Sequence, residues 1–344
     1  MVTNANIKRP LSAGKVLNVS LAMCLILVLV MIFSLSLGTA DISLKQLWSL
    51  LSGAPSDDIA NLIILRIRLP RVLLAGLVGF ALSLGGVVFQ ALLRNPLADP
   101  FILGVSSGSA FGAIVGILLD FGFLVGIPLM SFGGALVTIN LVMLIGSRKM
   151  GMESSTILLT GVIVNAFFTA IIMFFISITA DARLHTMLFW LYGDLSQSQF
   201  TQSVIVAPVV LIASLILYTF ARDLNIITSG EESALQLGVE VEKAKRICFL
   251  LVSLVIGLVV SFSGLIGFVG LIVPHLGRMA FGSDHRLLIP VSCLGGAIFL
   301  VASDTLARSI VSPSELPVGV ITAFVGAPFF ITLLRKKGSQ WDRA

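Results

Sequence analysis

The sequence predicts an all-α, polytopic membrane protein with about ten transmembrane helices. Hydrophobic residues make up 57% of its 344 residues and charged residues only 11%, whereas a soluble domain usually carries about 25% charged residues. The mean hydropathy of +1.08 is too high for a soluble domain of this length. Apolar runs close to the roughly 20 residues that cross a bilayer as a helix recur along the whole chain. We therefore treat residues 1–344 as a single transmembrane domain.

The predicted helices can be delimited in order along the chain. They are residues 16–37, 70–93, 99–119, 125–146, 154–179, 200–220, 246–263, 266–281, 287–307 and 317–334. The first run follows Lys8, Arg9 and Lys15 and resembles a signal peptide, but it is longer than an ordinary signal-peptide core. We therefore expect an uncleaved first membrane helix.

The distribution of positive charge predicts cytoplasmic N- and C-termini. This orientation leaves outside only six of the 22 Lys and Arg residues: Lys45, Arg66, Arg68, Arg71, Arg183 and Arg308. Cytoplasmic loops normally hold the excess of Lys and Arg, so this orientation is the favoured one. Three of the six precede the second run within one short window, which suggests that they act outside the bilayer. The pI is about 9.4. We expect the basic residues to contact lipid headgroups rather than nucleic acid, because no aromatic side chains interleave with a basic patch.

Two stretches carry helix-breaking and small residues. The second run ends at Arg94, and NPLADP at 95–100 cannot continue a helix because it contains two prolines. In residues 261–278, SFSGLIGFVGLIVPHLGR, three glycines at helical spacing predict a stripe that lets backbones approach closely. Pro274 should break or kink this run, and His275 is interpreted as a hydrogen-bonded structural residue rather than a ligand.

The longest weakly hydrophobic segment, 222–246, lies on the cytoplasmic side in this orientation. Within it, SGEESALQLGVEVEK predicts a short helix with Glu231 and Glu232 in its first turn, where negative charge suits the helix dipole. Gly238 stands where a C-terminal cap is expected. The helix has too few apolar side chains to hold itself in place. It is either a solvated connecting loop or a helix that packs on a soluble partner, and the rest of the chain favours the partner.

Six motifs together resemble one family of membrane proteins. They are IRLPR at 67–71, QALLRNPLADP at 90–100, LGVSSG at 103–108, GLIGFVGLIVPHLGR at 264–278, DHR at 284–286 and ELPVGVITAFVGAPFFI at 315–331. In this order they resemble the FecCD-type permease subunits of type II ABC importers, which take up iron–siderophore complexes, haem and cobalamin. The resemblance covers essentially the whole chain.

The resemblance implies the type II importer permease fold and a defined set of partners. The ten-helix subunit would form a homodimer around a central pathway in the inner membrane of a bacterial or archaeal cell. Two cytoplasmic ATPase subunits would carry the ATP and Mg²⁺, so this chain itself would need no cofactor. A periplasmic or lipid-anchored substrate-binding protein would dock on the outer face, and no nucleic acid would be bound.

The resemblance also assigns roles to particular residues. Binding-protein docking would involve Arg68, Arg71 and Arg308. The coupling helix that contacts the ATPase would include Glu231, Glu232, Ala234, Leu235, Leu237 and Gly238. A cytoplasmic gate would be formed by Asn95, Leu97, Ser154 and Ser155, and the pathway could be lined by Asn165, Phe168 and Thr169.

Alternatives remain for several of these roles. Asp304, four residues before Arg308, can pair with it on one helix face, and phospholipid could instead bind Arg68. The two serines could be an ordinary helix N-cap, because Ser and Thr are common at that position. Glu153 departs from the serine- and threonine-rich pattern of the family, which leaves the register of the match open by one residue. Core packing is the alternative role for Phe168.

The sequence argues against an enzyme. It contains no G-x-x-x-x-G-K-[ST] loop for ATP phosphates, no nucleophile–base pair and no metal-ligand cluster. An ion-coupled secondary transporter is one alternative, but it would more often hold an ionisable residue at mid-membrane and show inverted repeats. An ABC permease for free metal ions is another, and the FecCD-type motifs argue against it. The substrate stays open among iron–siderophore, haem and cobalamin; we favour an iron chelate, with a cobalamin-specific importer as the alternative.

Overall fold

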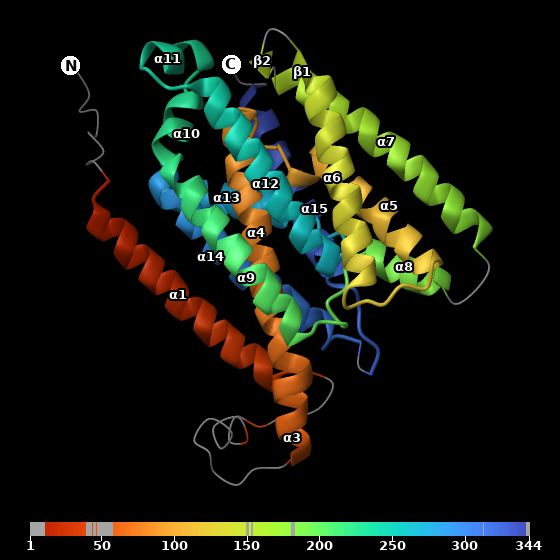
Figure 1. The fold of residues 1–344 in the computed structure, drawn as a ribbon. Helices are drawn as coiled ribbons and strands as arrows, with labels where there is room; N and C mark the ends of the chain where they lie inside the picture. The colour runs from red at the N-terminus through yellow and green to blue at the C-terminus, as the bar shows by residue number, and fades with distance from the viewer. Residues whose placement is uncertain are drawn as a thin grey trace.

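The computed structural model describes residues 11–38, 43, 46, 58–148, 151–152, 154–179, 183–311 and 313–341. Within these residues the regular secondary structure is helical apart from one short hairpin (Figure 1). The helices are α1 (Ala13–Ser36), α3 (Asp58–Leu62), η1 (Ile63–Arg68), α4 (Leu69–Leu92), η2 (Pro100–Leu103), α5 (Val105–Leu118), α6 (Gly126–Gly146), α7 (Ser154–Ile178), α8 (Arg183–Leu191), α9 (Phe200–Thr219), α10 (Ala221–Ile227), α11 (Glu231–Gln236), α12 (Val241–Ser263), α13 (Val269–Phe281), α14 (His285–Ala307) and α15 (Val318–Trp341). The antiparallel strands β1 (Ser147–Arg148) and β2 (Gly151–Met152) join α6 to α7.

The predicted all-α fold is confirmed, and each of the ten predicted apolar runs contains a helix. Seven helices in the described part of the chain are long and apolar enough to cross a bilayer, and three shorter apolar helices lie at 105–118, 269–281 and 318–333. Each of the ten corresponds to one predicted run. An all-α fold with about ten spans was therefore readable from hydropathy and length alone.

The largest difference from the sequence prediction concerns the start of the second span. The sequence predicts a helix from residue 70, whereas the structure has one continuous helical stretch from Ile59 to Leu92. Arg66 and Arg68 therefore lie inside a π-helical turn rather than in a loop before the helix, whereas Arg71 lies inside α4, within the predicted bounds. Hydropathy could not predict this, because it counts each arginine as a break and does not register a buried partner for its charge.

Helix α4 occupies the centre of the bundle (Figure 1). It packs against α9, α12, α13 and α14, and 20 of its 24 residues are buried. Two glycine pairs allow the close approach: a Cβ on Gly79 would overlap the carbonyl oxygen of Gly296 in α14, and a Cβ on Gly86 would overlap that of Gly270 in α13. Small residues are the usual means by which membrane helices approach this closely.

The predicted stripe of three glycines is wrong. Gly264 caps the end of α12 with a φ of +67°, and Gly267 lies in the connection before α13 with no atom near enough to contact an added Cβ. Gly264 packs closely against the carbonyl oxygen of Trp190 and Gly270 against that of Leu82, so the close approaches are to different elements rather than along one helix face. Helical spacing was misleading here because the chain leaves the helix at Gly264. Pro274 lies within α13 and does not end it.

The packing of α4 predicts the effect of one substitution. Gly79→Ala should lower the free energy of unfolding by about 1–3 kcal/mol, because its methyl group must displace the backbone of α14. Gly133→Ala in α6 is the matched control, since nothing lies within 4 Å of its added Cβ. The free energy of unfolding of both variants is measured in mixed detergent micelles. Equal stabilities would contradict close packing of α4 on α14.

Candidate docking, coupling and gate sites

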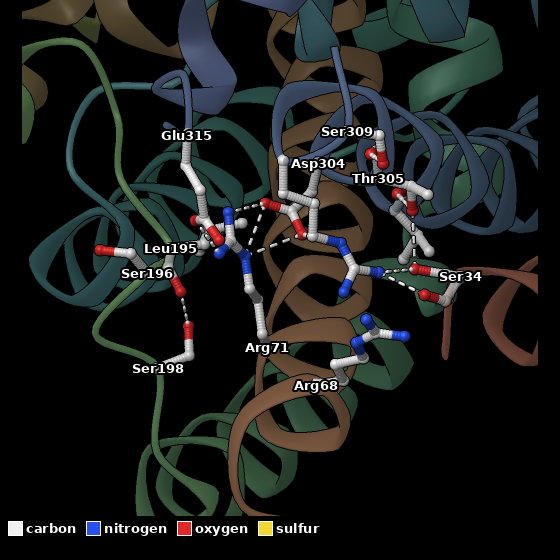
Figure 2. A network of polar contacts seen from close by, with 12 residues as sticks. Ser34, Arg68, Arg71, Leu195, Ser196, Ser198, Asp304, Thr305, Ser309 and Glu315 are labelled. Atoms are coloured by element: carbon white, nitrogen blue, oxygen red, sulfur yellow. Dashed lines mark hydrogen bonds and ion pairs between the residues drawn. The ribbon is translucent and has the colours of Figure 1, made fainter. Parts of the chain in front are cut away.

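The three arginines predicted to dock a partner come together at one end of the bundle. Arg68 and Arg71 lie where η1 passes into α4, and Arg308 caps the end of α14. We call these three residues, with Asp304 and Glu315, the arginine cluster (Figure 2). The cluster lies at the opposite end of α4 from α11 (Figure 1).

Arg71 is held between two carboxylates. Its Nε lies 3.0 Å from both carboxylate oxygens of Asp304, and its Nη2 lies 2.9 Å from Oδ1 of the same residue. Its Nη1 donates to Oε2 of Glu315 at 2.5 Å. The side chain of Asp304 is 1% exposed, whereas that of Glu315 is 35% exposed. The inner carboxylate is therefore sealed within the protein, and the outer one borders the surface.

The other two arginines tie α1 to the cluster. Arg308 donates through Nη2 to the carbonyl and hydroxyl oxygens of Ser34, and its Nε lies 3.9 Å from Asp304. Arg68 donates through Nη1 to the carbonyl oxygens of Leu35 and Ser36, at 2.7 and 2.9 Å. These carbonyls are at the end of α1, where a helix leaves backbone acceptors unsatisfied. The arginines thus complete the hydrogen bonding of α1.

This geometry differs from the expectation that the three arginines are free to bind a partner on the outer face. Arg68, Arg71 and Arg308 are 3–4% exposed and engaged within the chain. The expected pairing of Asp304 with Arg308 is also secondary, since Arg71 takes that carboxylate in a closer, bidentate geometry. Sequence reasoning missed Asp304 and Glu315 as partners of Arg71, although all three stand near span ends on the same predicted side. A docking role for the arginines stays a prediction.

The predicted coupling helix is present as α11, between α10 and α12. Its end forms a Schellman motif: the Gly238 N–H donates to the Leu235 carbonyl and the Val239 N–H to the Ala234 carbonyl. Gly238 has a φ of +82°, as the predicted glycine cap requires. The helix therefore has a defined stop and does not fray into the loop that follows.

The side chains of α11 divide into an inner and an outer set. Ala234 is fully buried in a small core with Ile227, Val241 and Ala244. Leu235 and Leu237 are 60% and 70% exposed, and Glu232 is exposed as well. Two apolar side chains directed at solvent are what a partner-binding helix presents.

Glu231 does not belong to the outer set. It pairs with the buried Lys245 of α12 at 2.7 Å and with Arg94, just after α4, at 3.6 Å. Both glutamates were expected at a partner contact, whereas only Glu232 faces outward. Glu231 instead links α11 to α12 through Lys245 and, more weakly, to the segment that follows α4 through Arg94.

The predicted gate loop, residues 95–100, has a defined local structure. The side chain of Asn95 accepts the N–H of Leu97 at 2.9 Å, and that of Asp99 accepts the N–H of Phe101 at 2.8 Å. These two turns bracket Leu97, whose side chain is 43% exposed. An exposed leucine on a short, hydrogen-bonded loop can move as one unit with its neighbours, which is compatible with the predicted gate.

The other predicted gate and pathway residues lie on α7. Ser154 and Ser155 form its first turn, but their side chains lie outside the described residues. Asn165 is exposed and Thr169 is half-buried. Phe168 is 5% exposed, which fits the core-packing alternative rather than pathway lining. Among the described residues, no cluster of three His, Cys, Asp or Glu side chains could hold a metal ion.

Known proteins align with this chain over the regions that contain all of these sites. The FecCD transport family matches residues 26–336. The cobalamin import system permease protein BtuC of Halobacterium salinarum is 42% identical over 280 residues, covering 81% of this chain and 75% of that protein. The hemin transport system permease protein HmuU of Yersinia pestis is 38% identical over 312 residues, covering 89% and 92%. The molybdate import system permease protein MolB of Haemophilus influenzae is 34% identical over 327 residues, covering 92% and 95%.

A solved structure has the same fold. An inward-facing ABC transporter, proposed to be of the metal-chelate type, matches with a TM-score of 0.83 and 32% identity. The match covers 93% of this chain and 99% of that one. Every residue of the arginine cluster, of α11 and of the gate loop lies within the region matched by the family.

The arginine cluster predicts a graded response to loss of its carboxylates. Asp304→Asn should lower the free energy of unfolding by about 3–5 kcal/mol, because it leaves a buried guanidinium without its main partner. Glu315→Gln should cost less than about 1 kcal/mol, since that pair is partly solvated. The free energies of unfolding of the two variants are compared in mixed micelles. A cost for Glu315→Gln that equals the cost for Asp304→Asn would show that the inner pair is not the anchor.

Proposed function

This chain belongs to the FecCD transport family of ABC-importer permease subunits, and we propose that it carries a bulky metal chelate across the membrane. The chelate is an iron chelate (iron–siderophore or haem) or cobalamin. The subunit is not an enzyme, since ATP hydrolysis in such importers takes place on a separate ATPase. The resemblance and the type of fold predicted from the motifs are thereby confirmed.

The relatives supply the main support for this substrate class. The names of BtuC and HmuU refer to cobalamin and hemin, and the solved structure is assigned to metal chelates. MolB is named for molybdate, a small oxyanion, and is less similar. An oxyanion is usually recognised by cationic groups or clustered N–H donors. A chelate within an organic ligand needs a wider and more apolar passage.

The exposed surfaces that could line such a passage are mostly apolar. The sequence of α7 contains no Lys, Arg, Asp or Glu, and its exposed face carries Asn165 beside Phe167. A polar Asn165 side chain on the outside of a membrane helix favours a water-filled passage or a partner subunit over lipid. A groove of about 600 Å³ between α8 and α15, lined by Tyr192, Phe268 and Phe324, supplies a second wall. Uncharged, aromatic walls suit a chelate better than an oxyanion.

Docking of the substrate-binding protein is assigned to the arginine cluster. Glu315 is the only partly exposed carboxylate of the cluster, and it occupies Nη1 of Arg71 on the surface side. A carboxylate of the binding protein can replace Glu315 at this position while Arg71 stays paired with Asp304. Docking would then exchange one ion pair for another and would leave no buried charge unpaired.

The remaining parts of the proposal concern assembly. Two copies of this chain form a homodimer around the pathway in the inner membrane, with both termini in the cytoplasm. Each copy receives one ATPase subunit on Leu235 and Leu237 of α11, and that subunit binds the ATP and Mg²⁺. Leu97 and Asn95, with Ser154 and Ser155, close the cytoplasmic end of the pathway in the resting state.

The substrate proposal is tested by transport. The permease is reconstituted in liposomes with its ATPase and its binding protein, and uptake of labelled cobalamin, haem, a ferric siderophore and molybdate is compared with and without ATP. We expect ATP-dependent uptake of one chelate and none of molybdate. Uptake of molybdate or of free metal ion in place of every chelate would contradict the substrate class.

The coupling proposal predicts the effect of a substitution in α11. Leu235→Gln should lower ATP-driven uptake at least tenfold, because it removes an apolar contact with the ATPase while its exposed position leaves the fold intact. Leu235→Met is the matched control, since it keeps an apolar side chain there. For both variants we measure how much ATPase copurifies and the rate of ATP-driven uptake. If Leu235→Gln assembles and transports like Leu235→Met, the ATPase binds elsewhere.

A further inference from the structure

The structure has a groove on the lipid side of the bundle that the proposed function does not use. It lies between α1 on one side and α9 and α14 on the other, and its volume is about 570 Å³. We call it the α1 groove. Its walls are mainly apolar and include Val16 and Leu17 of α1, Phe80 of α4, Leu215 of α9 and Leu294 of α14. The volume lies within the range of about 300–1,000 Å³ typical of ligand pockets.

Helix α1 forms one wall of the groove and is held mainly at its other end. Of its 24 residues only Ser34 is buried. Ser34 bonds to the hydroxyl of Thr305 at 2.6 Å and accepts from Arg308, and Arg68 binds the last carbonyls of α1. These polar contacts, which tie α1 to other helices of the described chain, all lie in its last turn. The first half of α1 borders the groove mainly through apolar side chains such as Val16 and Leu17.

The mouth of the groove carries unbalanced positive charge. Arg222 at the start of α10 lines the groove, is exposed and forms no ion pair with any described residue. Arg286 lines it too, but Asp284 binds that guanidinium through Nε and Nη2, the latter at 2.6 Å. The Arg286 side chain holds the pKa of the Asp284 carboxyl below its usual range, so this pair is nearly neutral overall. Lys15, next to the lining residue Val16, is exposed as well.

The position of the groove limits what can fill it. Its apolar walls belong to helices that span the bilayer, where water in an apolar cleft would be unfavourable and acyl chains are the surrounding solvent. Its charged mouth lies where α1 and α14 begin and α9 ends, at the level of the headgroups. The Tyr218 hydroxyl donates to the carbonyl oxygen of Arg286 at this level, which is a common position for tyrosine at a membrane interface.

We propose that the α1 groove binds an anionic phospholipid, with an acyl chain along the groove and the phosphate on Arg222. Guanidinium is well suited to phosphate because it donates two parallel hydrogen bonds and keeps its charge. In the orientation predicted from sequence, the mouth faces the cytoplasmic leaflet, whose anionic lipids are attracted by basic residues near the surface. The bound lipid would fill the space beside the weakly held half of α1 and hold that half against α9 and α14.

The test measures lipid retained by the full chain in detergent. Native mass spectrometry compares the affinity for phosphatidylglycerol with that for phosphatidylcholine of the same acyl chains. Arg222→Gln should weaken binding of phosphatidylglycerol about tenfold, and Arg222→Lys should restore part of it. Arg246→Gln is the matched control: it removes an exposed cation at the start of α12, on the same side of the bundle and outside the groove. It should leave binding unchanged.

Two further measurements separate the groove from surface charge. Ser20→Phe adds a ring to the wall of the groove and keeps Arg222, so it should also lower retention of phosphatidylglycerol, with the fold checked by thermal unfolding. Glycerol 3-phosphate should compete poorly, because it lacks the acyl chain. Equal retention by the parent and Arg222→Gln, equal affinity for both lipids, or displacement by glycerol 3-phosphate at equal concentration would each overturn the proposal.

Discussion

The bidentate contact between Arg71 and Asp304 is the constraint on which one end of this subunit depends. It joins α4, the most buried helix, to α14 through side chains that are 5% and 1% exposed. Separating such a pair in a low-dielectric interior leaves two uncompensated charges, so the ends of the two helices are held in one arrangement. Arg308 and Arg68 extend the arrangement to α1 through Ser34 and the last carbonyls of that helix. The arginine cluster therefore has a structural role, and docking on it stays a proposal.

The opposite end of the bundle is built differently. There Glu231 connects α11 to Lys245 and Arg94 by partly solvated ion pairs. The distance to Arg94, 3.6 Å, is longer than the 2.7 Å to Lys245. The small core under α11 is separate from the main core, and two leucines of α11 face outward. A rigid end and a more loosely attached end suit a subunit in which a partner moves α11 and the gate loop while the helices between them keep their packing.

The fold was largely predictable from the sequence, because span length and hydropathy are sufficient to locate helices in a bilayer. Gly238 and the acidic start of α11 were also predictable, since capping chemistry is local. The partners of Arg71 were not, because Asp304 and Glu315 are more than 200 residues away and only the packing of α4 on α14 brings them together. For the same reason the glycines at 264 and 267 were misread: their spacing fits a helix, and only the structure shows the chain leaving it at Gly264.

In the docking that we propose, Glu315 holds the surface side of Arg71 until a carboxylate of the binding protein replaces it. The most direct measurement is the dissociation constant of the binding protein for permease in nanodiscs, for the parent and for Glu315→Gln. Because Glu315→Gln removes the internal competitor and leaves the buried pair intact, we expect tighter docking, by about three- to tenfold at low salt, with the difference shrinking as salt rises. Unchanged or weaker docking by Glu315→Gln would contradict it.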